Sequence, residues 1–178
     1  SDTAPITVIS EIDVRSDNGD ASVNSEGADL YAGSILTDAL STGTVAANDI
    51  FVLGELRTIS RNGEFARVVS AQDLYAGTLT ASGGSAYVAA LRSTGTLEVK
   101  GSIRTFNSDG GSVSSAIFSD GSLFAGSVIA ESDQNAGVWA TKRISVQGDI
   151  VTNGGANSEV KTAWSPEEIF AVNISTDG

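Results

Sequence analysis

The chain has 178 residues, a net charge of −12, and neither cysteine nor histidine. It is long enough for one domain with a buried core. The missing residue types exclude disulfides, thiolate nucleophiles, histidine-dependent catalysis and ordinary zinc or copper sites. The acidic charge disfavours nucleic acids and anionic membrane surfaces, which bind clustered lysine and arginine. No apolar run approaches the roughly 18 residues that cross a bilayer, so we expect no membrane insertion.

Short apolar runs rich in β-branched residues, such as ITVISEIDV at 6–14 and RISVQGDIV at 143–151, predict many short strands divided by turns. No run with helical periodicity stands out. The chain starts with Ser1 and contains no methionine, which is typical of a processed product such as one that has lost a secretory signal. We therefore expect an extracellular or cell-surface location.

One heptapeptide recurs along the whole chain. In order it reads ITVISEI from Ile6, DLYAGSI from Asp29, IFVLGEL from Ile50, DLYAGTL from Asp73, LEVKGSI from Leu97, SLFAGSV from Ser122, ISVQGDI from Ile144 and EIFAVNI from Glu168. Its fifth residue is an anchor, found at Ser10, Gly33, Gly54, Gly77, Gly101, Gly126, Gly148 and Val172. Successive anchors are 23, 21, 23, 24, 25, 22 and 24 residues apart. This regularity predicts stacked coils of a repeat protein.

Residues at fixed offsets from the anchors suggest an alternation between two kinds of coil. Two residues after each anchor stands an aliphatic residue: Ile12, Ile35, Leu56, Leu79, Ile103, Val128, Ile150 and Ile174. Two residues before it, valine alternates with an aromatic residue: Val8, Tyr31, Val52, Tyr75, Val99, Phe124, Val146 and Phe170. Because side chains alternate along a strand, we expect both sets to point inward. The structural unit is then a pair of coils.

Each anchor strand is followed by a turn rich in Asn, Gly, Asp and Ser, and then by a second short strand such as FARVVS at 65–70. Glycine at the anchor permits a bend, so each coil has about three straight segments. The sequence therefore predicts a single all-β domain over residues 1–178, a three-sided parallel β-helix (β-solenoid) of about eight coils of 21–25 residues, arranged in two-coil repeats.

Nothing in the sequence indicates an enzyme: the turns are short, the coils are nearly uniform, and we predict neither catalytic nor cofactor-binding residues. Calcium is the one cofactor that the turns suggest, because stacked turns can gather carboxylates. The candidate ligands are Asp17, Asp20, Asp109, Asp120 and Asp133. Neither the EF-hand pattern nor the nonapeptide of calcium β-rolls occurs. Turn-forming aspartate is the preferred interpretation.

Three further groups of side chains have a structural interpretation. Thr58, Thr105 and Thr152 share one offset, and their parity places them in the core beside alanines. Arg57 and Arg104 share an outward offset, which predicts a weak surface charge ladder. Both tryptophans, Trp139 and Trp164, follow the anchor strands and are expected in the core or at corners.

Solenoids normally carry caps, because an end coil exposes unpaired strand edges. Here strand-like sequence starts near Ile6 and runs to Ile174. The predicted assembly edges are Ile6, Val8, Ile12, Ile169, Phe170 and Ile174. Two complementary ends favour a contact between copies that does not close and so builds a filament.

Strings such as GTLEVKGSIRT and RISVQGDIVTNGG resemble repeats of phage tail fibres and other trimeric attachment proteins. The stack of coils with glycine in nearly every one also resembles the bactofilin-type polymerising β-helices. These resemblances imply a fibrous role and assign no functional residue.

Three functional hypotheses remain open, and in all of them the protein is structural. The leading one is a self-assembling subunit of an extracellular fibre or surface filament, in which the partner is the protein itself, stacked head to tail. The alternative is a viral or cell-surface attachment (adhesion) rod, possibly trimeric, whose further partner is a receptor or glycan. A bactofilin-like cytoskeletal polymer is the third.

Overall fold

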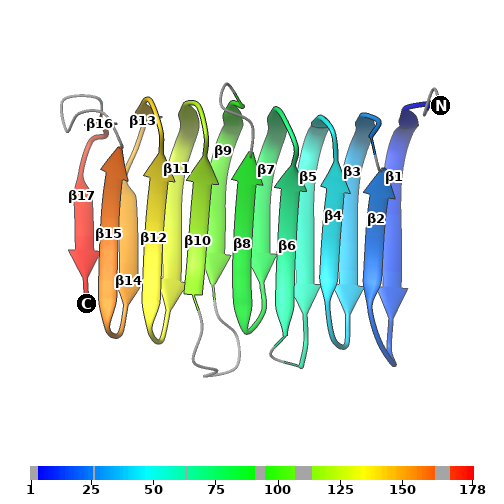
Figure 1. Cartoon of the computed structure of the whole chain (residues 1–178), viewed down its shortest axis with the longest axis horizontal. Coiled ribbons are helices and arrows are strands. Elements are labelled where there is room, and N and C mark those ends of the chain that lie inside the picture. Colours follow the sequence, from blue (N-terminus) through cyan, green and yellow to red (C-terminus); the bar gives the residue numbers. More distant parts are fainter. Residues whose placement is uncertain (1–3, 26, 63, 91–94, 107–113, 163–168) are drawn as a thin grey trace.

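The computed structural model describes residues 4–25, 27–62, 64–90, 95–106, 114–162 and 169–178. All regular secondary structure in these ranges is β-strand, and every paired strand is parallel to its neighbour. Strands alternate between two sheets as the chain advances, so the chain winds into a rod with β1 at one end and β17 at the other (Figure 1). The predicted parallel β-solenoid is confirmed.

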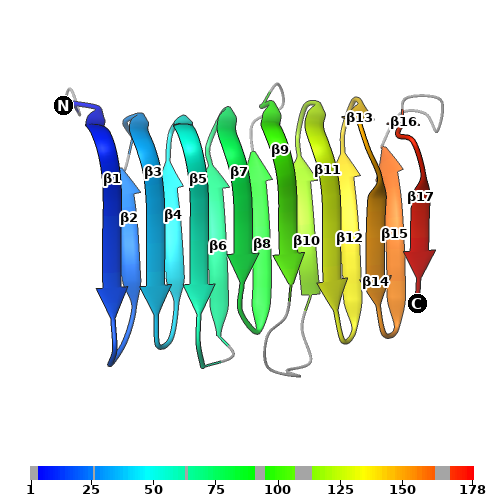
Figure 2. The ribbon, with the colours of Figure 1, turned by 180° about the vertical axis from the view of Figure 1, so that it is seen from behind.

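The first sheet contains the anchor strands. They are β1 (Ile6–Ser16), β3 (Leu30–Ala39), β5 (Ile50–Ser60), β7 (Leu74–Ser82), β9 (Leu97–Phe106), β11 (Leu123–Ser132), β13 (Ile144–Val146) with β14 (Ile150–Gly154), and β16 (Ile169–Phe170) with β17 (Ile174–Asp177). Seen from behind, these strands form one layer (Figure 2).

The second sheet contains the return strands. They are β2 (Ala21–Ser25), β4 (Gly43–Ala47), β6 (Phe65–Ser70), β8 (Ser85–Ala90), β10 (Ser114–Ser119), β12 (Asn135–Ala140) and β15 (Asn157–Thr162). Each anchor strand and the return strand after it make one coil, numbered here from the N-terminus. The described residues thus form seven complete coils and the anchor strand of an eighth.

Hydrogen bonding joins the predicted three segments of a coil into two sheets. The bend at the anchor lies within the long first-sheet strands, where pairing shifts register between Val8 and Glu11 and at the same place in later coils. Most of these strands continue through the shift because the backbone resumes pairing after one to three unpaired residues. The solenoid is therefore a two-layered rod whose first sheet has a short unpaired segment in each coil, called the bulge here, which is one residue longer in alternate coils.

Equivalent side chains lie over one another from coil to coil, as predicted. Ile35 is paired with Leu56, and Leu56 with Leu79, and all three are at most 1% exposed. The second sheet contributes a parallel column of β-branched residues: Val23, Val45, Val68, Val88, Ile117, Val138 and Val160. Burial of these columns is the main source of stability.

The predicted threonine column is also in the core. Thr58, Thr105 and Thr152 are completely buried, as are Ala81 and Ala130 in the same column. The Thr37 hydroxyl donates to that of Thr58 at 2.7 Å. Burial of a hydroxyl is inexpensive when it is hydrogen-bonded in this way. The Thr105 hydroxyl accepts a bond from Ser115 at 2.6 Å, whereas the buried Thr152 hydroxyl has no hydrogen-bond partner among the described residues.

The expectation that the aromatic residues point inward is wrong. Tyr31 is paired with Phe51 and Phe51 with Tyr75, on the outer face of the first sheet. Alanine, not the aromatic residue, is in register with the inward valine, as in the pair of Ala32 and Val52. Alternating parity holds only within a straight strand, and the prediction carried it across a bulge whose length changes from coil to coil.

The bulge explains the two-coil repeat. In odd coils three residues separate the inward valine from the next inward aliphatic residue, as in Leu53–Glu55. In even coils the inward residue is alanine, and only two residues separate it from the next inward aliphatic residue, as Gly77 and Thr78 do. Odd coils therefore carry one extra residue, and coils of the two kinds alternate along the rod.

Even-coil glycines are required because of a close backbone approach. A Cβ atom on Gly77 would lie 2.6 Å from the carbonyl oxygens of both Leu53 and Gly54, which belong to the bulge of the coil before. The odd-coil glycine Gly148 is less constrained, since its nearest neighbour is the Gly126 oxygen at 3.0 Å. Ser10, at the odd-coil position of the first coil, has no earlier coil against it among the described residues.

We predict that Gly77→Ala lowers the free energy of unfolding by about 1–3 kcal/mol, because the added methyl group forces two packed strands apart. The matched change Gly148→Ala is expected to cost clearly less. Urea-induced unfolding of the two variants and the wild type measures both effects. Equal losses from the two substitutions would contradict the proposed role of the bulge carbonyls.

Candidate interaction surfaces

The described aspartates among the calcium candidates are not brought together. Asp17 forms an ion pair with Arg61 at 2.8 Å, and Asp20 accepts a hydrogen bond from the Thr42 amide at 3.0 Å. No three acidic side chains within the described ranges form a group that could hold a metal ion. Of the other candidates, Asp120 and Asp133 occupy separate turns, and Asp109 lies outside the described residues.

Another group of aspartates does form a ladder, at the start of the anchor strands. Asp49 accepts the amide of Asp73 at 2.8 Å, and Asp73 accepts the amide of Thr96 at 2.7 Å. Each carboxylate thus bonds the backbone of the following coil, which is a structural role. Asp29 accepts the hydroxyl of Tyr31 at 3.3 Å, and desolvation together with this carboxylate raises the pKa of Tyr31.

Three aromatic rings stack beside this ladder on the outer face of the first sheet. The ring centroids of Tyr31 and Phe51 are 5.0 Å apart and so are those of Phe51 and Tyr75, with interplanar angles of 5° and 6°. The strand spacing of about 4.8 Å sets this separation. The rings cover one another's faces and present their edges to solvent.

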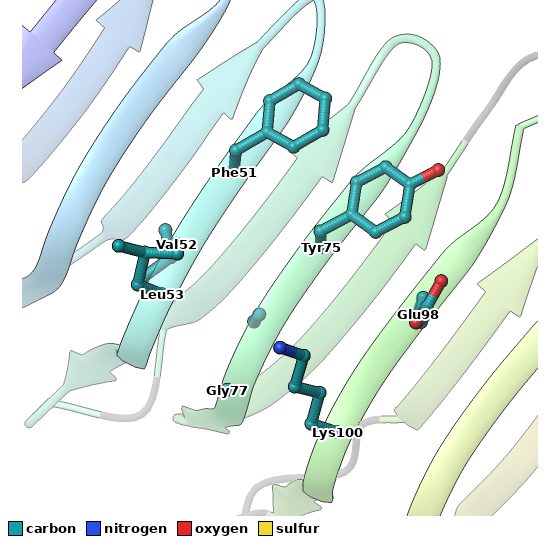
Figure 3. Close-up of a pocket in the computed structure, with 8 residues that line it drawn as sticks. Phe51, Val52, Leu53, Tyr75, Gly77, Glu98 and Lys100 are labelled. Atoms are coloured by element: carbon teal, nitrogen blue, oxygen red, sulfur yellow. The ribbon is translucent and has the colours of Figure 1, made fainter.

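A row of alternating projections and recesses runs next to the rings. The first residue of each odd-coil bulge points outward, and Ile9 and Leu53 are 94% and 85% exposed. The even-coil bulge begins with glycine, so a recess of about 250 Å³ lies over Gly77, between Leu53 and Lys100 (Figure 3). A second recess, of about 200 Å³, lies between Lys100 and Gln147.

The outer face of the second sheet carries a second aromatic group. The Trp139 indole lies against Gly137, where a Cβ atom would overlap the ring. Its Nε1–H donates to Glu159 at 2.7 Å, and the Lys161 ammonium bonds the same carboxylate at 3.0 Å. Phe118 is in register with Trp139 on this face. The expected core or corner position of Trp139 is therefore wrong, and Trp164 lies outside the described residues.

Arg57 and Arg104 point outward, as expected from their offset. Arg104 forms an ion pair with Glu131 at 2.9 Å, and both side chains are well exposed. Pairs of this kind contribute at most about 1 kcal/mol. They do not mark a binding site.

The predicted assembly edges lie at the two ends of the rod. In β1, Ile6, Val8 and Ile12 are only partly buried. At the other end Ile169 packs partly against the core, and Ile174 is 49% exposed. Phe170 is 54% exposed and belongs to the outer column of aromatic residues, in register with Ser145. Its place at the core edge is taken by Ala171, which packs partly against the core.

The fold and these surfaces define a parallel β-solenoid whose distinctive side chains are on its outer faces and at its ends. Comparison with known proteins adds no relative: no family model matches the chain, and no curated protein or solved structure is significantly similar to it. Across the described ranges no helix is present that could cross a membrane.

We predict that the Trp139 contact persists until the pH falls below 4.5, the ordinary glutamate value. The bond from Lys161, and then that from Trp139, lowers the pKa of Glu159. The stabilisation is present above the unfolded pKa and is lost as the pH falls through the lower folded value. Tryptophan fluorescence of a Trp164→Phe variant should therefore change only below pH 4.5.

The control for this titration is Glu159→Gln in the same background, which removes the titrating group. It is expected to abolish the acid transition. A midpoint above the ordinary glutamate pKa, or an unchanged transition in the Gln variant, would contradict the assignment.

Proposed function

We propose that the protein is a structural rod, a subunit of a fibre or surface filament that grows by stacking coil on coil, head to tail. The observation that carries this proposal is the match between the two end strands of the first sheet. Each presents the same side-chain columns as every interior strand. The alternation of long and short bulges also continues from one end strand to the other.

The columns match position by position. Ile6 and Ile169 belong to one core column, and Ile12 and Ile174 to another. A copy whose β1 pairs with β17 of the copy before would bury these partly exposed residues. Each such contact would remove apolar surface from water at about 25 cal/mol per Å².

The bulge lengths match as well. The first described coil has the long bulge, with three residues between Val8 and Ile12. The last anchor strand has the short one, because only Val172 and Asn173 lie between Ala171, which packs against the core, and Ile174. A long bulge following a short one is what every second interior step of the rod shows, so stacking preserves the two-coil repeat.

The second sheet sets a further requirement for such stacking. The described residues contain an anchor strand for each of eight coils but a return strand for only the first seven. In a stack, β15 and the β2 of the next copy would therefore stand two strand positions apart. One extended segment must fill this position. Pairing through an exposed edge is a common mode of β-strand addition.

An attachment rod, possibly trimeric, is the second candidate. The observation in its favour is the exposed apolar row on the outer face of the first sheet, which a lateral neighbour would cover. Assembly size separates the two functions, since a trimer is closed and a stacked filament is open. An extracellular location remains a prediction.

Thr7→Pro tests the filament. The Ile6 amide donates to the backbone carbonyl of Asp29, the residue before β3, at 2.9 Å. Successive amides point to opposite sides of a strand, so the Thr7 amide faces the unpaired edge. Proline there removes an edge donor without breaking β1–β3 pairing. We predict that the wild type grows into open-ended polymers as concentration rises, that Thr7→Pro suppresses this growth, and that Thr7→Ala retains it.

Light scattering over a concentration series, followed by negative-stain microscopy, measures this growth. The proposal is overturned if the wild type keeps one discrete mass at every concentration and shows no fibres. A discrete trimer would support the attachment rod instead.

A further inference from the structure

We propose that the outer face of the first sheet, over coils 1 to 4, is a docking surface for a second copy of this chain, in which Ile9 and Leu53 of one copy fit over Gly77 and Gly33 of the other. This contact is lateral and closed. It is separate from end-to-end stacking.

The projections are the first part of the argument. Ile9 and Leu53 are the two most exposed large apolar side chains among the described residues, and both begin a long bulge. Scattered apolar side chains are normal on a protein surface. These two are not scattered, because they occupy the same position in the row two coils apart and flank Gly33.

The recesses are the second part. The hollow over Gly77 is bordered by Leu53 and Lys100, with Ala76 and Val52 also in its lining (Figure 3). At about 250 Å³ it is smaller than pockets for small molecules, which measure roughly 300–1,000 Å³. It suits a single side chain. The bulge carbonyls beneath Gly77 prevent any side chain of its own from filling it.

Symmetry then selects the partner. A two-fold axis parallel to the strands reverses the order of coils and keeps each row of residues opposite itself. With the axis between coils 2 and 3, coil 1 faces coil 4 and coil 2 faces coil 3. Every projection in the row then meets a glycine: Ile9 meets Gly77, and Leu53 meets Gly33. The same operation places the Tyr31 ring opposite that of Phe51.

Charge is compatible with this arrangement despite the net charge of −12. Along the row next to the projections, Glu11 faces Thr78 and Glu55 faces Ser34. In the row after that, Asp13 faces Thr80. These carboxylates meet neutral residues. At the start of the strands, however, the same operation sets Asp29 opposite Asp49, so repulsion in this row weakens the contact.

The area predicts a weak association. Four strands at about 4.8 Å spacing and ten residues long cover roughly 600 Å² on each copy. The total of roughly 1,200 Å² is at the lower end for specific interfaces. The dimer should therefore be concentration-dependent.

Sedimentation velocity from micromolar to millimolar protein tests the proposal in the Thr7→Pro background, in which end-to-end growth is suppressed. This parent protein is expected to form a closed dimer. The double variant Ile9→Asp/Leu53→Asp should weaken it by roughly tenfold or more, because dimerisation would bury unpaired charges. The matched control Gln147→Asp changes the same bulge position in coil 7, outside the contact, and should dimerise like the parent protein.

Both substituted residues are exposed, so circular dichroism and the urea midpoint should be unchanged and a loss of dimer is not a loss of fold. A parent protein without a dimer at any concentration would overturn the proposal, as would a double variant that dimerises normally. Edge stacking adds chains without limit, whereas this contact stops at two. The two proposals therefore fail in distinguishable ways.

Discussion

Parallel, in-register hydrogen bonding between successive coils is the constraint on which the rest of the structure depends. It places equivalent positions of successive coils about 4.8 Å apart, so each side chain must pack against a side chain of similar kind directly above and below it. Aliphatic residues meet this condition in the core. Thr37 and Thr58, which are adjacent in one column, meet it by bonding to each other. Aromatic rings meet it outside the core, where Tyr31, Phe51 and Tyr75 stack at a distance close to the strand spacing.

The bulge adds a second period to this ladder. An extra residue in alternate coils makes backbone carbonyls approach the next coil closely, and a side chain has no room there at Gly77 and Gly126. The last anchor strand has Val172 at this position, and its side chain is 68% exposed. The same extra residue projects from the surface, as at Leu53. One backbone feature therefore underlies the two-coil repeat, the close approach at the even-coil glycines and the relief of the outer face. The surface pattern is a consequence of how the coils stack.

The sequence predicted most of the fold because the repeat is direct evidence of stacking. Coil number, strand positions, the aliphatic columns and the buried threonines all follow from offsets counted within straight strands. The aromatic column was misplaced because its offset was counted across the bulge. The signal that could have placed it was alignment from the strand start, which sets Leu30 beside Ile50 and therefore Tyr31 beside Phe51. The recesses depend on three-dimensional relief between coils, which the glycine pattern alone does not give.

Distances between spin labels along one outer column test the stacking most directly, and the absence of cysteine makes labelling straightforward. Thr7, Glu98 and Phe170 occupy the same column, four and seven strand steps apart. For cysteine variants at these positions, the account predicts separations of about 19 Å from Thr7 to Glu98 and about 34 Å from Thr7 to Phe170. Two distances that do not grow with the number of intervening coils would contradict it.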